Sequence, residues 1–208
     1  GGPRKLLVKA TWIDNGDDSD DNDDLDLRVG VLLADGRMRF ICAPDRVGNF
    51  DTEPFLRHTG DVTSASFAEP ATETVEVNPA IAQRCGGKVA LVFSVFSAVS
   101  NGAVSVASLR PVMRMEYGNQ VVECAFDFTT TKAAFDDSVY TYVIGTAVID
   151  CDHVRLEPSG ITSDPGSENT PWLTWAGPSG VRITMNGPEV FKGNDPSASS
   201  DGSNRRYI

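Results

Sequence analysis

The sequence predicts an all-β protein built as a β-sandwich, with two packed, mainly antiparallel sheets and few short helices. Three observations lead to this prediction. Apolar residues recur with the period of strands, and turn-forming pairs separate the strand-like runs. Helical periodicity is almost absent from the 208 residues, and residues 78–84, with Pro79 in the first turn, are the best short candidate. Seven to nine strands need two packed layers to bury their apolar faces.

The first half of the chain contains three predicted strands and one predicted hairpin. Residues 6–13 (LLVKATWI) and 24–34 (DLDLRVGVLLA) are strand-like, and the second run alternates polar and apolar residues over its first half. Asp35-Gly36 separates this run from a further strand at 37–42. An Asp-Gly pair between two such runs predicts a hairpin with a two-residue type I′ turn, which needs two positive φ angles.

The second half contains a central strand and another hairpin. Residues 88–99 (KVALVFSVFSAV) are apolar on both alternating sets, which predicts a strand covered on both faces in the middle of a sheet. Residues 112–117 and 120–128 flank Gly118-Asn119, a second two-residue turn signal. The other strand-like runs are 139–150 and 153–156.

A change of composition predicts two regions. Residues 4–158 form the expected sandwich domain, and residues 159–208 form an extension rich in Gly, Pro and Ser that we expect to be partly flexible. Trp172, Trp175 and the run 181–185 interrupt the extension, which indicates that part of it packs back onto the body.

Negative charge is concentrated in one segment. The net charge is −11 at pH 7, and residues 14–26 contain eight aspartates and no Lys or Arg, so the other 195 residues carry only −3. Binding of nucleic acid through its phosphates needs a basic face, so no nucleic-acid partner is expected. No apolar run approaches the ~20 residues of a membrane-spanning helix, so no transmembrane segment is expected.

The four cysteines favour a cytoplasmic protein. Cys42, Cys85, Cys124 and Cys151 are far apart and lack the C-x-x-C spacing of a structural zinc site. We expect four reduced, mostly buried thiols. No positively charged segment followed by an apolar one, as in a secretory signal, is found after Gly1-Gly2.

The aspartate-rich segment has two interpretations of equal weight. Crowded carboxylates repel one another, and Ca²⁺ accepts six to eight such oxygens with tolerant geometry. If Asp24 begins a strand, Asp24 and Asp26 project from one face about 6.6 Å apart, close enough to converge on one ion. The spacing is not that of an EF-hand, because Asp23 replaces the required glycine and Val29 the bidentate glutamate. The alternative is a solvated, disordered insertion that keeps the protein soluble.

The order of the segments resembles the TerD family of bacterial tellurium-resistance and stress proteins. A strand ending in Trp12 precedes D-L-D-L at 24–27 and a D-G turn, and H-T-G-D at 58–61 and V-E-V at 75–77 precede the central apolar strand. The resemblance covers roughly residues 5–158. It implies a cytoplasmic, calcium-binding β-sandwich that serves in stress resistance and has no established catalytic activity.

The resemblance also implies a set of calcium ligands from three segments. Asp24 and Asp26 match the family's D-L-D strand start, and Asp61 matches its S-G-D segment. Of the family's G-D-D-E stretch only Glu73 remains. The residues expected to replace the missing oxygens are Asp20, Asp21 and Asp23. The other possibilities are one weakly bound ion or none.

Two common catalytic motifs are absent from the sequence, although a Ser-His-Asp triad needs only neighbours in space. The sequence contains no G-x-S-x-G elbow and no phosphate-binding G-x-x-x-x-G-K-[ST] loop. His58 is interpreted as a loop histidine with a local hydrogen bond, or alternatively as a group beside the metal ligands, and His153 as a surface residue.

We therefore expect a non-enzymatic protein whose acidic loop is ordered by Ca²⁺ and presents a surface to a protein partner. The alternative is a metal-free interaction module of the same fold, in which the acidic loop faces a basic partner. A hydrolase, which would need a deep pocket lined by convergent polar groups, is less favoured.

Overall fold

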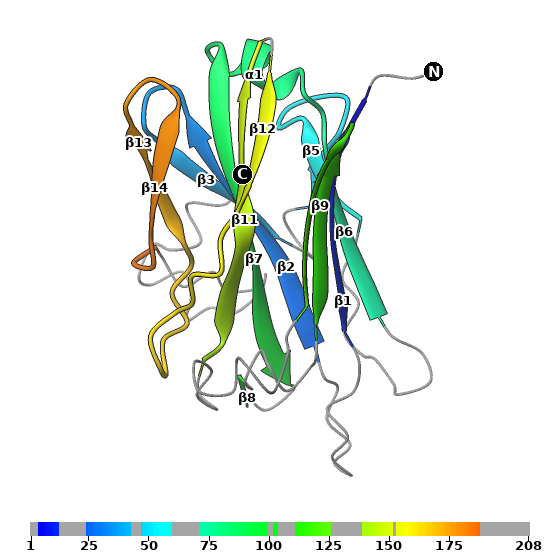
Figure 1. Cartoon of the computed structure of the whole chain (residues 1–208), viewed down its shortest axis with the longest axis vertical. Coiled ribbons are helices and arrows are strands. Elements are labelled where there is room, and N and C mark those ends of the chain that lie inside the picture. Colours follow the sequence, from blue (N-terminus) through cyan, green and yellow to red (C-terminus); the bar gives the residue numbers. More distant parts are fainter. Residues whose placement is uncertain are drawn as a thin grey trace.

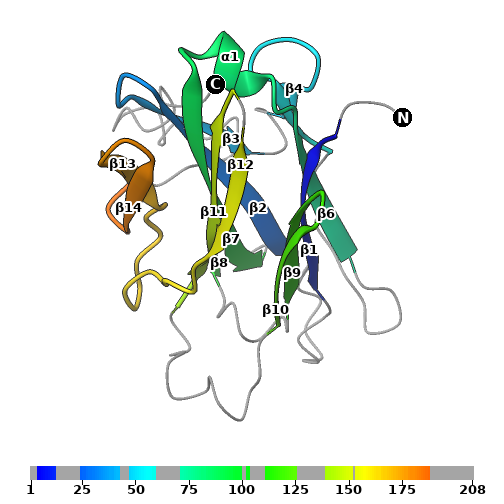
Figure 2. The same ribbon diagram turned by 45° about the horizontal axis from the view of Figure 1, so that its top comes forward.

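The computed structural model is an all-β sandwich, which confirms the predicted fold class. Two large antiparallel sheets pack face to face, and a two-stranded hairpin forms a third layer (Figure 1). Figure 2 shows the same order of layers, from the hairpin through the central sheet to the outer sheet. The structure describes residues 4–12, 24–42, 47–59, 71–99, 102–103, 111–125, 139–151 and 153–187.

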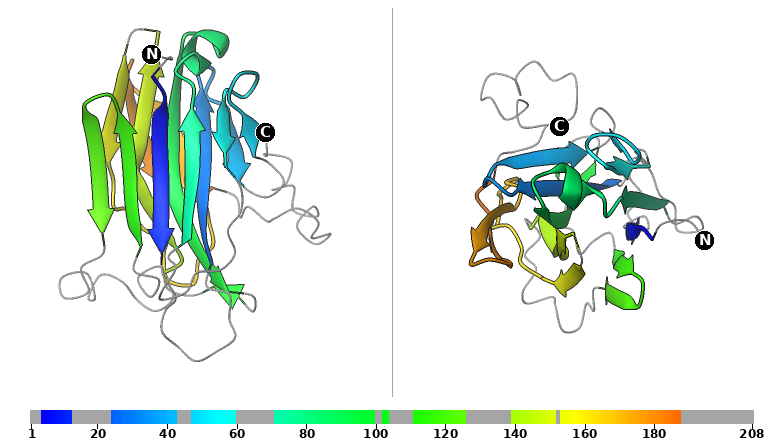
Figure 3. Two further views of the ribbon diagram at one scale, coloured as in Figure 1. Left: turned by 90° about the vertical axis from the view of Figure 1, so that its right-hand side faces the viewer. Right: turned by 90° about the horizontal axis from the view of Figure 1, so that it is seen from above.

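Sheet A has the strand order β10-β9-β1-β6-β5-β4, and Figure 3 shows it face-on in its left panel. Every second residue of β1 is buried, from Leu6 to Trp12, because alternate side chains of a strand point to opposite faces. The strands are β1 (Leu6–Trp12), β4 (Gly48–Asn49), β5 (Leu56–His58), β6 (Ala71–Val77), β9 (Val112–Tyr117) and β10 (Gln120–Ala125).

Sheet B has the order β12-β11-β7-β2-β3, with β8 paired to β7. Its strand β7 lies between β2 and β11, and residues 89–97 are buried, so the predicted central strand is confirmed. The strands are β2 (Asp24–Leu33), β3 (Met38–Cys42), β7 (Lys88–Val99), β8 (Gly102–Ala103), β11 (Thr141–Asp150) and β12 (Val154–Pro158).

The side chain of Gln120 joins the two sheets along one edge. The side-chain Nε2 of Gln120 donates to the carbonyl of Val154 at 2.6 Å, and its Oε1 accepts from the backbone N–H of Leu156 at 3.0 Å. This amide links β10 of sheet A to β12 of sheet B. The apolar core between the sheets includes the fully buried Trp12 and Phe93.

Both predicted hairpins form, but the turn at Asp35 differs from the prediction. Leu33 pairs with Arg37 across a three-residue loop, and Gly36 alone in it has a positive φ, of 89°. This is the loop in which a glycine follows a type I turn, and the predicted type I′ turn is wrong. In the second hairpin a two-residue turn joins β9 to β10, and Gly118 has a φ of 56°.

The third layer covers the outer face of sheet B. Its hairpin consists of β13 (Trp172–Ala176) and β14 (Gly180–Thr184), and Leu173 is fully buried. The indole Nε1 of Trp175 donates to the carbonyl of Leu33 at 2.9 Å, and Lys88 Nζ lies 4.1 Å from the indole ring centre. This part of the extension therefore packs onto the body, as its tryptophans indicated. The boundary between residues 4–158 and 159–208 stays a prediction.

We expect Trp175→Phe to lower the free energy of unfolding by about 1 to 2 kcal/mol. Phenylalanine retains an aromatic ring but leaves the carbonyl of Leu33 without its indole donor. Urea unfolding at 25 °C measures the change, with Thr174→Ala on the exposed side of the same strand as the control. Equal stability of the two variants would show that the indole contributes little to docking of the hairpin.

The single helix of the described residues is short. Helix α1 (Ile81–Arg84) has Ala80 as its N-cap residue, and the backbone N–H of Ala80 donates to the side chain of Asn78. Pro79 therefore lies before the helix and not in its first turn. No helix in the described part of the chain has the length and apolar character needed to cross a bilayer.

The cysteines differ in part from the prediction. Cys85 and Cys124 are half-buried and Cys151 is exposed, so the expectation of mostly buried thiols is wrong for these three. None of the three forms a disulfide. The side chain of Cys42 lies outside the described residues.

Candidate functional site

Two pairs of buried ionisable side chains lie near the start of β2, one on each face of this strand. Asp26 and Arg28 lie on β2, His58 ends β5 and Glu73 lies on β6. Their exposed fractions are 4%, 8%, 2% and 1%. Because an unpaired buried charge is costly, such a group persists only with partners. We call these four residues the buried charge cluster.

Glu73 connects the two sheets at this point. It lies on the inward face of β6, in alternation with Ala71 and Val75. Strand β3 pairs with β2 only from Arg28 onward, and the backbone N–H of Leu27 donates to Glu73 Oε2 at 2.8 Å. A carboxylate of sheet A thus satisfies a backbone donor of sheet B.

The second partner of Glu73 is His58. The Nε2 of His58 lies 3.1 Å from Glu73 Oε2, and both side chains are almost completely buried. His58 ends β5 and pairs in register with Val75, so the interpretation as a loop histidine is wrong. The alternative position, beside the predicted metal ligand Glu73, is the one observed.

Asp26 and Arg28 form the other half of the cluster. They are two residues apart on β2 and therefore share a face, with Arg28 Nη2 3.8 Å from Asp26 Oδ2. The guanidinium carbon of Arg28 lies 4.4 Å above the ring centre of Phe96, and its buried Nε has no hydrogen-bond partner. Arg28 is thus held by a long ion pair and a cation–π contact.

Burial raises the pKa of Glu73 above its ordinary value. The hydrogen bond with His58 opposes this rise, and the negative charge of Asp26 adds to it. Asp26 is therefore close enough for its charge to disfavour ionisation of Glu73. A buried carboxylate of this kind is stabilised by a positive partner, whether a proton, a basic side chain or a metal ion.

Of the seven predicted metal ligands, the structure describes the side chains of Asp26 and Glu73, which lie near the start of β2 but on opposite faces of it. Asp24 begins β2 as predicted, but its side chain lies outside the described part of the structure. The other candidates, Asp20, Asp21, Asp23 and Asp61, lie entirely outside the described residues. Within the described residues, no group of three or more His, Cys, Asp or Glu side chains could hold a metal ion.

Arg28 is the site residue that the sequence analysis missed. The sequence could have indicated this residue, because a strand that begins D-L-D-L-R places Arg28 on the same face as Asp24 and Asp26. Its presence changes the electrostatics, since a fixed positive charge already lies beside a predicted metal ligand. His153 is exposed and lies 3.7 Å from Asp150, which confirms its predicted surface position.

We expect the destabilisation caused by Glu73→Gln to decrease as pH rises. A carboxyl whose pKa is raised by folding contributes stability that is complete below its ordinary value of 4.5 and is lost as pH rises through the folded-state value. Glutamine cannot ionise, so it does not undergo this loss. Urea unfolding of both proteins at pH 4, 5.5 and 7 measures the difference. A penalty that grows with pH would instead show that His58 holds Glu73 ionised.

This geometry defines a class of protein, a two-sheet β-sandwich with buried carboxylates at one end. Its fold is TerD-like: the structure is similar to a homologue of telluride resistance protein TerD, SCO6318 from Streptomyces coelicolor A3(2). The TM-score is 0.53 and the identity 14%, over 79% of this chain and 94% of that one. The protein of unknown function SAV2460 is similar over the same shares, with a TM-score of 0.52 and 20% identity. No family model and no curated protein matches the sequence.

Proposed function

We propose that this chain is a non-enzymatic, cytoplasmic protein of the bacterial tellurium-resistance and stress-response type. We propose further that it binds Ca²⁺ where β2 begins. The TerD-like fold supports the first part. The observation that supports the second is the burial of two carboxyl groups, Asp26 and Glu73, near the strand start at Asp24.

The donor chemistry of the described residues fits calcium in part. Carboxylate oxygens are the ligands that this hard cation prefers, and the neighbouring aspartates of residues 14–26 are available in the sequence to complete its shell. Bound calcium would relieve the repulsion between the carboxylates and link the acidic segment to the sandwich. That segment would then present an ordered surface to a protein partner.

A calcium titration of thermal stability tests this proposal. Ligand at ten times its dissociation constant stabilises the native state by about 1.4 kcal/mol, which raises the melting temperature by about 2 to 6 °C for a chain of this size. We expect millimolar CaCl₂ to produce such a rise and the double variant Asp24→Ala, Asp26→Ala to abolish it. The matched control is Asp51→Ala, Asp164→Ala, which removes two exposed aspartates elsewhere. A rise that persists without Asp24 and Asp26 would contradict the assignment.

The second candidate function is a metal-free interaction module, and Arg28 and His58 are the observation that favours it. These side chains place positive or protonatable groups against Asp26 and Glu73, so the buried carboxylates are balanced without a metal ion. The acidic segment would then bind a basic partner directly. This candidate predicts no change of melting temperature with calcium and partner binding that weakens with salt.

A further inference from the structure

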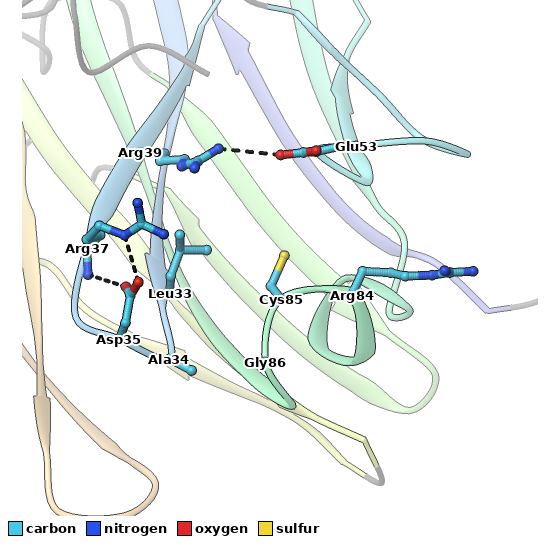
Figure 4. A pocket seen from close by; sticks show the side chains of 9 residues that line it. All are labelled: Leu33, Ala34, Asp35, Arg37, Arg39, Glu53, Arg84, Cys85 and Gly86. Carbon is cyan, nitrogen blue, oxygen red and sulfur yellow. Dashed lines mark hydrogen bonds and ion pairs between the residues drawn. The ribbon is translucent and has the colours of Figure 1, made fainter.

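A cavity of about 340 Å³ lies at the end of the sandwich opposite the buried charge cluster. It is bounded by the turn between β2 and β3, the loop before β5 and the residues that follow α1 (Figure 4). Asp26 and Leu33 are seven residues apart on β2, which is roughly 23 Å along a strand. The cavity is therefore separate from the proposed calcium site.

Arginine residues gather around the cavity of an otherwise acidic chain. The cavity lining includes Arg37, Arg39 and Arg84 against only two acidic residues, Asp35 and Glu53. The chain as a whole has a net charge of −11. The guanidinium groups of Arg37 and Arg39 face this hollow of an acidic protein and favour an anionic ligand, because the guanidinium fork matches the oxygens of carboxylates and phosphates.

One of these arginines is held in place by its neighbour. Arg37 donates from Nε to Asp35 Oδ2 at 2.7 Å and from its backbone N–H to Asp35 Oδ1 at 3.0 Å. The backbone hydrogen bond is the main reason that the pKa of Asp35 is lowered, so the carboxylate stays ionised. Arg37 therefore keeps a fixed orientation while its terminal nitrogens remain at the cavity.

A second arginine spans the open edge between the sheets. Arg39 Nη1 lies 3.4 Å from Glu53 Oε1, and the side chains are 39% and 75% exposed. A solvent-exposed pair of this length contributes little stability, so a ligand anion can take the place of Glu53. Figure 4 shows the thiol of Cys85 pointing into the space beneath this pair, whereas Arg84 extends away from the thiol.

The loop that carries Glu53 has a defined structure. Asn49 Oδ1 accepts from the backbone N–H groups of Asp51 and Thr52, both at 2.9 Å. Phe55 has a φ of 63°, which is rare for a bulky residue, and backbone hydrogen bonds to Thr52 and Asn78 hold it there. Backbone strain of this kind is concentrated at functional sites. Arg84 lies over the ring of Phe55, at 5.9 Å.

We propose that this cavity binds a small molecule through an anionic oxygen group, a phosphate or a carboxylate, which displaces Glu53 from Arg39. The volume corresponds to the lower end of the range for small-molecule sites. Arg37 and Arg39 contact the anion, and Cys85 lies at the base of the site. Glu53 competes with the ligand and occupies Arg39 when the ligand is absent.

Cys85 provides a direct readout of occupancy. Burial and then the charge of Glu53 raise its pKa, so alkylation by iodoacetamide is slow and easily followed at pH 8.5. Peptide mapping by mass spectrometry would give the rate at Cys85, with the exposed Cys151, which does not line the cavity, as the internal reference. We expect inorganic phosphate or citrate to slow alkylation of Cys85 alone, relative to NaCl at equal ionic strength. The more potent of the two probes identifies the anionic group.

Three variants are expected to change the half-protecting concentration of the anion in different ways. Arg39→Gln should raise the half-protecting concentration at least tenfold, because the main ligand contact is lost. Glu53→Gln should lower it about three- to fivefold, because the competitor is removed. Arg182→Gln, an exposed arginine on β14, should leave it unchanged. Protection equal to that of NaCl, no effect of Arg39→Gln, or no tightening by Glu53→Gln would each overturn the proposal.

Discussion

Replacing Glu73 by alanine is expected to lower the free energy of unfolding by about 3 to 5 kcal/mol. The substitution removes the acceptor of the Leu27 backbone N–H and the buried partner of His58 at once. Both groups remain inside the protein, where a polar group without its partner is costly. Urea unfolding at 25 °C measures the loss.

The same strand offers a matched control. Glu76 also lies on β6 but on its outer face, where it pairs with Lys5 at 3.4 Å and Arg57 at 3.6 Å near solvent. We expect Glu76→Ala to cost less than about 1 kcal/mol, as is usual for exposed pairs. Similar losses for the two variants would show that Glu73 does not connect the sheets in the way its contacts indicate.

Replacing Arg28 by methionine is expected to strengthen calcium binding about ten- to a hundredfold, which corresponds to about 1.4 to 2.8 kcal/mol. The guanidinium lies 3.8 Å from Asp26 and repels a second cation at the same carboxylate. Methionine retains an unbranched stem that can pack on the ring of Phe96. Isothermal titration with CaCl₂ measures the affinity.

Arg28→Lys is the control for this experiment, because it retains the positive charge. We expect its calcium affinity to stay near that of the unaltered chain. If Arg28→Met binds no calcium either, the metal-free interaction module is the better account of the protein. The substitution thus separates the two proposed functions at the residue where they differ.

Strand positions and faces were predictable because they follow local alternation. The central strand at 88–99 and the strand at 112–117 have the predicted bounds, and β2 begins at Asp24. Successive side chains of a strand point to opposite faces, so the residues of one strand alone show which side chains share a face. The turn after β2 was less predictable, because an Asp-Gly pair is compatible with more than one loop length.

Part of the candidate site was also predicted from the chain alone. The D-L-D pattern indicated Asp24 and Asp26, and the resemblance to TerD proteins added Glu73. The partners of these carboxylates were not predicted. Nothing in the local pattern relates Glu73 to the N–H of Leu27, which is 46 residues away. The same is true of the cavity beneath Arg39 and Glu53, which combines residues of sheet B with the loop between β4 and β5 and the end of α1.

The sequence by itself determined the class of fold, the longer strands such as β2 and β7, and the acidic character of residues 14–26, since periodicity and charge are properties of neighbouring residues. Only the tertiary structure decided how the charges are balanced. Pairing of β5 with β6 places His58 against Glu73, tertiary packing buries Arg28, and the loops at the far end enclose the arginine-lined cavity. The physical reason is that burial and pairing depend on residues distant in the chain, and these determine the energy of an ionised group.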